Sequence, residues 1–235
     1  MADEINVIID GKTYKARSNQ TIVEIATENG IYIPTLCYFH GMKSCLGTCR
    51  VCTVKSNGRN VAACTQPVQS DAIIEVDTVE LRDLRSALIE MLFVEGNHFC
   101  PSCEKSGDCD LQALAYRFNM LVPRFPLNFN NREIDMHTSP LIAMEHNRCV
   151  LCKRCVEEIK TESGEKIFSF INRGNHLEVH IDPKHGSEIT PALGKKAAHL
   201  CPVGAILYKG EGFNRPYGSR KYDHRPIGSK IESKK

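Results

Sequence analysis

The sequence predicts an α+β protein made of three small domains, each with its own group of cysteines. Three observations support this prediction. Strand-like hairpins surround a short helix in the first 78 residues, eleven of the 12 cysteines fall into three separate groups, and a proline-rich stretch without hydrophobic periodicity follows residue 120. The expected units are a first domain at 1–78, a helical domain at 79–120, a linker at 121–140, a third domain at 141–209 and a basic tail at 210–235.

The first domain has the pattern of a small mixed sheet crossed by one helix. The dipeptides Asp10-Gly11 and Asn57-Gly58 each separate two strand-like runs and favour two-residue hairpin turns. Thr21 and Glu24 have capping-box spacing and predict the start of a helix, which Gly30 can end in the left-handed conformation. The expected strands are residues 5–9, 12–17, 51–54, 60–63 and 73–76.

The first cysteine group has the spacing of a 2Fe-2S site. It contains one C-x2-C pair, and eleven residues separate this pair from a further cysteine on each side: Cys37, Cys49, Cys52 and Cys64. A loop with one close pair and two distant thiolates is typical of plant-type 2Fe-2S sites, whereas zinc sites prefer two close pairs. The extra Cys45 either replaces Cys37 as a ligand or is a small buried residue. Gly41 and Gly47 are expected to let the backbone approach the cluster and donate hydrogen bonds to it.

Two helices are expected on either side of the second cysteine group, at 80–95 and 111–118. The longer one is amphipathic and is predicted to bury one apolar stripe: Leu81, Leu84, Leu88, Met91 and Leu92. The intervening loop begins near Gly96. The second group of candidate ligands therefore lies between two helices.

The second group combines three cysteines with one histidine: His98, Cys100, Cys103 and Cys109. This composition suits either zinc or a 4Fe-4S cluster, and the position between two apparent iron-sulfur sites favours the cluster. In an extended segment His98 and Cys100 project to the same side, so His98 is the candidate fourth ligand. The alternative is that His98 is a partly buried histidine or a helix C-cap residue.

The third group predicts an all-cysteine 4Fe-4S site. Its C-x2-C-x2-C run is followed by a remote Cys-Pro, and the candidate ligands are Cys149, Cys152, Cys155 and Cys201. Zinc is the weaker alternative, because three thiolates at this spacing are typical of a cubane cluster. Strands are expected at 167–173 and 176–182, in an insert that separates Cys201 from the other three.

Composition excludes several classes of function. The formal net charge of +2, from 30 basic and 28 acidic residues, gives no argument for nucleic acid or a membrane as partner. No signal peptide or run of 18 apolar residues is visible, so we expect a soluble cytoplasmic protein. In that reducing compartment twelve cysteines are expected to bind metal rather than form disulfides. No phosphate-binding loop, nucleophile elbow or carboxylate pair is present, so we expect no catalytic residue in this chain.

The C-terminal tail is strongly basic. Residues 212–235 hold seven lysines or arginines against two acidic residues. Such a segment is either simply solvated or lies along a partner subunit. The sequence leaves both alternatives open.

The order of ligands in PTLCYFHGMKSCLGTCRVC, EGNHFCPSCEKSGDCDLQ and RCVLCKRCVE resembles a known arrangement. The chain, over roughly residues 5–208, is similar to the N-terminal iron-sulfur region of the large electron-input subunit of respiratory complex I and of iron-only hydrogenases. It most resembles the small electron-transfer subunits in the diaphorase half of cytoplasmic NAD-reducing nickel-iron hydrogenases. The early stop of the chain supports this expectation. Relative to complex I, the histidine lies at 98 where position 96 is Gly, and eleven rather than ten residues separate Cys37 from Cys49.

The resemblance implies a plant-type ferredoxin-like (β-grasp) domain, a small domain with a one-histidine, three-cysteine cluster and a 4Fe-4S ferredoxin-like domain. It implies one 2Fe-2S and two 4Fe-4S clusters that relay electrons between a flavin- and NAD-binding diaphorase subunit and the small and large hydrogenase subunits. An equivalent subunit of an NAD-dependent formate dehydrogenase or complex I-like diaphorase is the alternative. A multi-zinc structural module is the more distant one.

Overall fold

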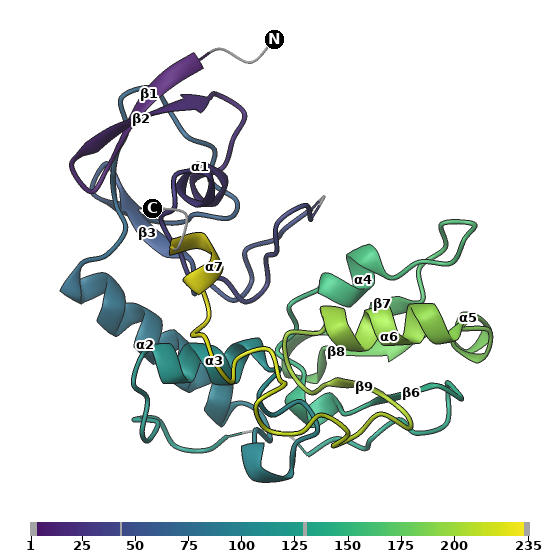
Figure 1. Cartoon of the computed structure of the whole chain (residues 1–235). Helices are drawn as coiled ribbons and strands as arrows, with labels where there is room; N and C mark the ends of the chain where they lie inside the picture. The colour runs from purple at the N-terminus through teal and green to yellow at the C-terminus, as the bar shows by residue number, and fades with distance from the viewer. Residues whose placement is uncertain (1–3, 43, 129–130, 233–235) are drawn as a thin grey trace.

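The computed structural model describes residues 4–42, 44–128 and 131–232. Figure 1 shows a sheet domain at the N-terminal end, a pair of helices in the middle and a mixed α/β region formed by later residues. The last part of the chain, drawn in yellow, runs back past the middle helices to the N-terminal domain.

The N-terminal domain contains a five-stranded mixed sheet in the order β2-β1-β5-β3-β4. The central pair β1 and β5 is parallel, with Ile8 opposite Ile73, and the other neighbours are antiparallel. The elements are β1 (Glu4–Ile9), β2 (Lys12–Arg17), α1 (Ile22–Glu28), β3 (Thr53–Ser56), β4 (Arg59–Ala62) and β5 (Ile73–Glu75). A mixed sheet with one helix is the arrangement that the sequence predicts.

Turn and cap residues fix the connections in this domain as expected. Asp10-Gly11 and Asn57-Gly58 all have positive φ, which is the geometry of a type I′ hairpin turn. The backbone N–H of Thr21 donates to the Glu24 carboxylate at 2.8 Å, so the capping box opens α1. Gly30, at φ 71, follows the last turn of this helix.

The middle of the chain forms two helices joined by a cysteine loop. They are α2 (Val79–Val94) and α3 (Asp110–Arg117), with a short 3-10 turn, η1 (Cys100–Ser102), between them. The predicted apolar stripe of α2 is only partly correct. Leu81 is buried, but Leu84, Leu88, Met91 and Leu92 are only partly buried, and the fully buried row contains Leu81, Arg85 and Ile89. Arg85 can lie inside because its guanidinium donates to the Thr53 carbonyl at 2.8 and 3.2 Å.

The third part of the chain contains two small antiparallel sheets, β6 with β9 and β7 with β8. Residues Phe168 and Ile181 are paired at one end of the second sheet. The elements are β6 (Ile142–Met144), η2 (His146–Arg148), α4 (Arg154–Glu158), β7 (Phe168–Ile171), η3 (Gly174–His176), β8 (Glu178–Ile181), α5 (Pro183–Ser187), α6 (Pro191–Leu200) and β9 (Ile206–Tyr208). The hairpin expected between Cys155 and Cys201 is thus present.

The described residues form two hydrophobic cores, and the boundary between these cores does not follow the boundaries of three separate domains. One core lies within the N-terminal domain. The other joins Leu36, Cys37 and Val51 of the first cysteine loop to buried residues of α2, α3 and the third region. The first cysteine loop therefore packs against the domains that hold the other two cysteine groups.

The described part of the linker, 121–128 and 131–140, is tied to both of its neighbours. Arg124 binds Glu90 of α2, which is buried, at 2.7 Å. Arg132 donates its backbone N–H to Asn147 at 2.8 Å and its guanidinium to the Asn175 carbonyl at 3.0 Å. These bonds restrict the movement of the third region relative to α2.

The later part of the described basic tail is bound to its own chain, whereas residues 210–219 are exposed. Lys221 forms an ion pair of 2.6 Å with Asp110, and the Tyr222 hydroxyl donates to the same carboxylate. Further along, Glu232 of the helix α7 (Ser229–Glu232) forms an ion pair with Arg117 of α3. Lys221, Tyr222 and α7 therefore lie along their own chain, and docking of the tail on a partner subunit stays a prediction.

None of the helices in the described residues is long and apolar enough to cross a membrane.

Candidate iron-sulfur sites

The first cysteine group converges in a loop beside β3 and α1. The Sγ atoms of Cys52 and Cys64 are 3.3 Å apart, and the backbone N–H of Cys37 donates to the Cys49 sulfur at 3.4 Å. All four predicted ligands are buried: Cys37, Cys49, Cys52 and Cys64. The structure thus brings together the four thiols that the sequence proposes for the 2Fe-2S cluster.

Cys45 belongs to the same cluster of sulfurs. Its Sγ lies 3.9 Å from that of Cys37 and 3.6 Å from that of Cys64, and these three sulfurs lie within 4.8 Å of one another. Unlike the other four cysteines, Cys45 is only partly buried. The interpretation of Cys45 as an isolated apolar filler is therefore incomplete, because its thiol contacts candidate ligands.

The charges of these thiols depend on one another. Hydrogen bonds from the Cys45 and Cys49 thiols lower the pKa of Cys37. Contact with the Cys37 and Cys45 thiols raises the pKa of Cys64. So many sulfurs at contact distance cannot all ionise without a compensating positive charge. A metal centre supplies that charge.

The two glycines of this loop have different roles. Both have positive φ, 90° at Gly41 and 65° at Gly47, so both favour glycine. The N–H of Gly47 donates to the Cys45 sulfur at 3.4 Å, and a β-carbon there would lie 3.1 Å from Thr65. A β-carbon at Gly41 would meet nothing within 4 Å. The close approach predicted for both glycines is seen toward sulfur only at Gly47.

The second group surrounds one small cavity between α2 and α3. The cavity lining includes all four predicted ligands, His98, Cys100, Cys103 and Cys109. Gly204 closes one side, where a β-carbon would lie 2.7 Å from the Cys103 sulfur. The N-cap position of α3 is Cys109 itself, whose sulfur accepts the Gln112 N–H at 3.4 Å. The donors and the cavity fit a cluster at this place.

His98 occupies the space that glycine leaves at position 96. A β-carbon at Gly96 would lie 2.6 Å from Nε2 of His98 and 2.8 Å from the Asn147 carbonyl oxygen. Burial, together with the smaller effect of the Arg148 charge, lowers the pKa of His98 to about 4, so the imidazole is neutral at pH 7. A neutral imidazole is the form that binds metal. The histidine at 98 and the glycine at 96 thus depend on each other.

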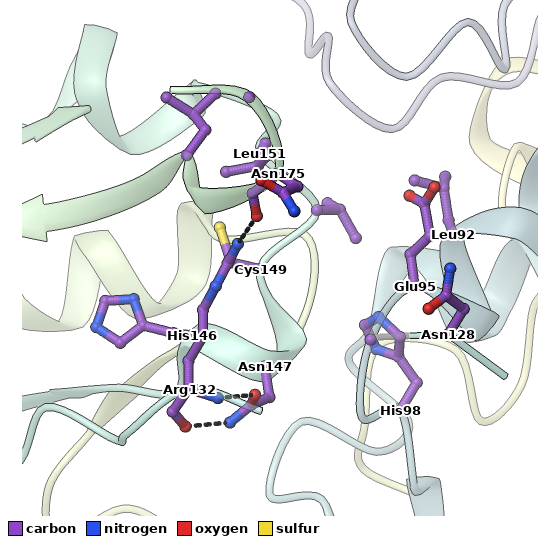
Figure 2. Close-up of a pocket in the computed structure, with 14 residues that line it drawn as sticks. Leu92, Glu95, His98, Asn128, Arg132, His146, Asn147, Cys149, Leu151 and Asn175 are labelled. Atoms are coloured by element: carbon purple, nitrogen blue, oxygen red, sulfur yellow. Dashed lines mark hydrogen bonds between the residues drawn. The ribbon is translucent and has the colours of Figure 1, made fainter. Parts of the chain in front are cut away.

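His98 also lines a larger outer pocket of about 450 Å³. Figure 2 shows His98 on one side of this pocket and the Cys149 loop on the other, with Arg132 bonded to Asn147 and Asn175. One candidate ligand of the second site, His98, and one of the third, Cys149, therefore line a common pocket.

Replacing Gly96 with alanine is expected to displace His98 and change the second site. Overpacking of this kind costs about 1–3 kcal/mol. The measurement is the EPR spectrum of the reduced second cluster in the anaerobic protein, together with the unfolding midpoint. Gly212→Ala is the matched control, because a β-carbon there would meet only the flexible Glu104 side chain, at 3.3 Å. Equal spectra for the two variants would contradict this role of Gly96.

The third group surrounds another small cavity, lined by its four cysteines, by apolar side chains and by the basic residues Lys153 and Arg154. The predicted ligands there are Cys149, Cys152, Cys155 and Cys201. Leu151 and Lys153 have positive φ, 51° and 68°, so the C-x2-C-x2-C loop winds tightly around the cavity. Cys201 lies directly after α6, and the cap N–H of this residue donates to the Ala197 carbonyl at 3.1 Å.

The buried thiols of the second and third sites are poor acids without a metal. Burial raises the pKa of Cys109 and of Cys149 to about 12. It also raises the pKa of Cys152 and Cys155. Because the thiolate is the metal ligand, these sites hold protonated thiols when empty and release protons when iron binds.

Three family models match consecutive stretches of the chain. Residues 2–79 match a 2Fe-2S iron-sulfur cluster binding domain, and residues 85–124 match the NADH-ubiquinone oxidoreductase-G iron-sulfur binding region. Residues 139–207 match the ferredoxin-like domain of NADH-quinone oxidoreductase subunit 3. These matches confirm the predicted fold class.

A close relative decides the family. The chain is 50% identical over 224 residues to the gamma subunit of the NAD-reducing hydrogenase HoxS of Cupriavidus necator, and the alignment covers 95% of each protein. This chain belongs to the family of NAD-reducing hydrogenase gamma subunits. The family that the sequence motifs suggest is thereby confirmed.

Other relatives agree with membership of the gamma-subunit family. A chain in a crystal structure of an NAD+-reducing [NiFe]-hydrogenase in the H2-reduced state matches with a TM-score of 0.87 and 37% identity, over 97% of this chain and 98% of that one. The mitochondrial NADH-ubiquinone oxidoreductase 78 kDa subunit of Candida albicans is 30% identical over 220 residues, which are 91% of this chain but only 30% of that protein. The gamma subunit is thus related to the N-terminal region of the large complex I subunit, as the motifs indicate.

Proposed function

We propose that this gamma subunit is the electron relay of an NAD-reducing [NiFe]-hydrogenase and carries one 2Fe-2S and two 4Fe-4S clusters. When bound, such clusters accept and release single electrons. The proposed partners are a flavin- and NAD-binding diaphorase subunit on one side and the small and large hydrogenase subunits on the other. We expect the isolated chain to catalyse no reaction.

The observation that carries the proposal is the convergence of three separate donor sets within one chain. The second and third sets each line a single cavity, and the first forms one contiguous group of sulfurs. The proposed ligands are Cys37, Cys49, Cys52 and Cys64 for the 2Fe-2S cluster, His98, Cys100, Cys103 and Cys109 for one 4Fe-4S cluster, and Cys149, Cys152, Cys155 and Cys201 for the other.

Protein groups around the first two donor sets are arranged to tune a bound cluster. The backbone N–H of Cys37 donates to the Cys49 sulfur in the first site, and that of Gln112 donates to the Cys109 sulfur in the second. Such hydrogen bonds stabilise added negative charge and raise a reduction potential. His98, as a neutral ligand in place of a thiolate, acts in the same direction.

In the complex purified without oxygen, we expect the gamma subunit to contain about ten iron atoms in addition to those of its partners. This number is the sum of one 2Fe-2S and two 4Fe-4S clusters. Iron and sulfide analysis of the gamma subunit, expressed with its partners and then separated, measures this directly. EPR of the reduced protein should show one 2Fe-2S and two 4Fe-4S signals. A colourless chain loaded with zinc would contradict the proposal, and about six iron atoms would remove one 4Fe-4S cluster from it.

A further inference from the structure

A single buried arginine touches the loops of all three candidate sites. Arg154, the first residue of α4, is 7% exposed. Its Nη2 donates to the Tyr38 carbonyl at 3.0 Å, and its Nη1 donates to the Asp110 carboxylate at 3.2 Å and to the Leu200 carbonyl at 3.4 Å. Segments from residue 38 to residue 200 thus meet at one guanidinium.

Each group that Arg154 binds is the sequence neighbour of a proposed ligand. Tyr38 follows Cys37 of the first site, Asp110 follows Cys109 of the second, and Leu200 precedes Cys201 of the third. Arg154 itself lies directly before Cys155. A shift of this side chain would therefore move the backbone beside all three donor sets.

The charge of Arg154 is permanent and only partly balanced. A guanidinium keeps its proton at any physiological pH. Asp110 contributes one negative charge nearby, but Lys221 pairs with the same carboxylate at 2.6 Å. The three side chains therefore sum to one net positive charge. Arg154 and Asp110 are buried, where electrostatic interactions are stronger than in water, and Lys221 is half exposed.

We propose that Arg154 is a positioning residue for electron transfer. Its side chain fixes the relative placement of the three cluster loops, and its positive charge stabilises the reduced form of the clusters around it. This inference rests on the proposed relay function. The planar guanidinium of Arg154, with its several N–H donors, is essential, because one lysine ammonium cannot reproduce three hydrogen bonds directed to separate loops.

Arg85 provides the matched control. It is also a buried arginine, 3% exposed, but among the residues that the structure describes its guanidinium donates to the Thr53 carbonyl alone, next to Cys52 of the first site. Its removal should therefore affect the 2Fe-2S cluster alone.

The test uses the intact complex with Arg154→Met, Arg154→Lys or Arg85→Met in the gamma subunit. Potentiometric EPR titration gives the midpoint potential of each cluster, and stopped-flow reduction by NADH gives the rate at which the clusters fill. Arg154→Met is expected to lower the potentials of the 2Fe-2S cluster and at least one 4Fe-4S cluster, and to slow electron transfer by about tenfold or more, since small displacements of reacting groups have large kinetic effects. Arg154→Lys should keep the potentials near those of the wild type while transfer still slows.

Several outcomes would overturn this role. Potentials and rates like those of the wild type in Arg154→Met, or a change confined to one cluster as in Arg85→Met, would contradict it. If Arg154→Met does not assemble, Arg154→Lys decides, because wild-type transfer rates in that variant would exclude the positioning role. Absence of the three EPR signals in the wild-type complex would instead contradict the relay function itself.

Discussion

A gamma subunit that carries both Cys37→Ala and Cys45→Ala is expected to lose its 2Fe-2S cluster completely, whereas neither single substitution should do so. The four buried thiols are the proposed ligands, and Cys45 is the partly exposed fifth. With Cys37 removed, the Cys45 sulfur can take its place, because it lies only 3.9 Å from Cys37 and 3.6 Å from Cys64. The single variant Cys37→Ala should therefore retain a cluster with an altered EPR spectrum.

The measurement is EPR of the dithionite-reduced protein, with iron analysis of the separated subunit. Cys45→Ala is the control and should leave the 2Fe-2S spectrum and iron content as in the wild type. The opposite pattern, with the cluster lost in Cys45→Ala and unchanged in Cys37→Ala, would identify Cys45 as the native ligand. The double variant should contain about two iron atoms per chain fewer than the wild type, which is the content of one 2Fe-2S cluster.

The predicted donor sets rest mainly on local spacing in the sequence. A C-x2-C-x2-C run brings three sulfurs to one point whatever surrounds it, and hairpin dipeptides such as Asn57-Gly58 determine strand pairing through backbone sterics. The family and the α+β fold class follow from these local signals. The assignment of each ligand to its cluster stays a prediction.

Long-range contacts could not be predicted in the same way. Arg154 and Asp110 look like ordinary charged residues of short helices, and only the fold shows that they are buried and paired. The predicted stripe of α2 was wrong at Leu84 and Met91, because the buried positions go instead to Arg85 and Glu90, which bond to Thr53 and Arg124, and periodicity cannot detect such partners. Leu88 and Leu92 are partly buried and pack against the core. An arginine directly inside a cysteine motif was the available signal for Arg154.

The contacts of the basic tail could not be predicted from composition either. Its excess of lysine and arginine indicates either solvation or a partner, yet Lys221 pairs with Asp110 of its own chain, and Arg117 of α3 donates to the Ile227 carbonyl of the tail. Burial alone would raise the pKa of the Asp110 carboxyl, but the Lys221 and Arg154 charges outweigh burial and hold this pKa below its usual value. The resulting stabilisation is present above the usual carboxyl pKa and is lost as the pH falls through the lowered one.

Removing the tail's contacts with Asp110 is therefore expected to destabilise the subunit strongly. The double substitution Lys221→Met with Tyr222→Phe leaves a buried carboxylate with Arg154 as its remaining charged partner in the described structure. The loss of such hydrogen-bonded partners at a buried charge costs about 2–4 kcal/mol. With a slope of about 2 kcal/mol per M in urea, the unfolding midpoint should fall by about 1–2 M.

Anaerobic urea unfolding of the loaded subunit, followed by its visible absorbance, measures the change in the midpoint. Lys230→Met is the matched control, because it removes one positive charge from an exposed position of the same tail. If that substitution lowers the midpoint as much as the double variant does, net tail charge and not the Asp110 contact determines stability. If neither variant changes the midpoint, the tail's fold along α3 does not stabilise the subunit. The expected result, a large effect of the double variant alone, would show that the C-terminal segment holds the loop beside Cys109 in place, and so links the tail to the second cluster site.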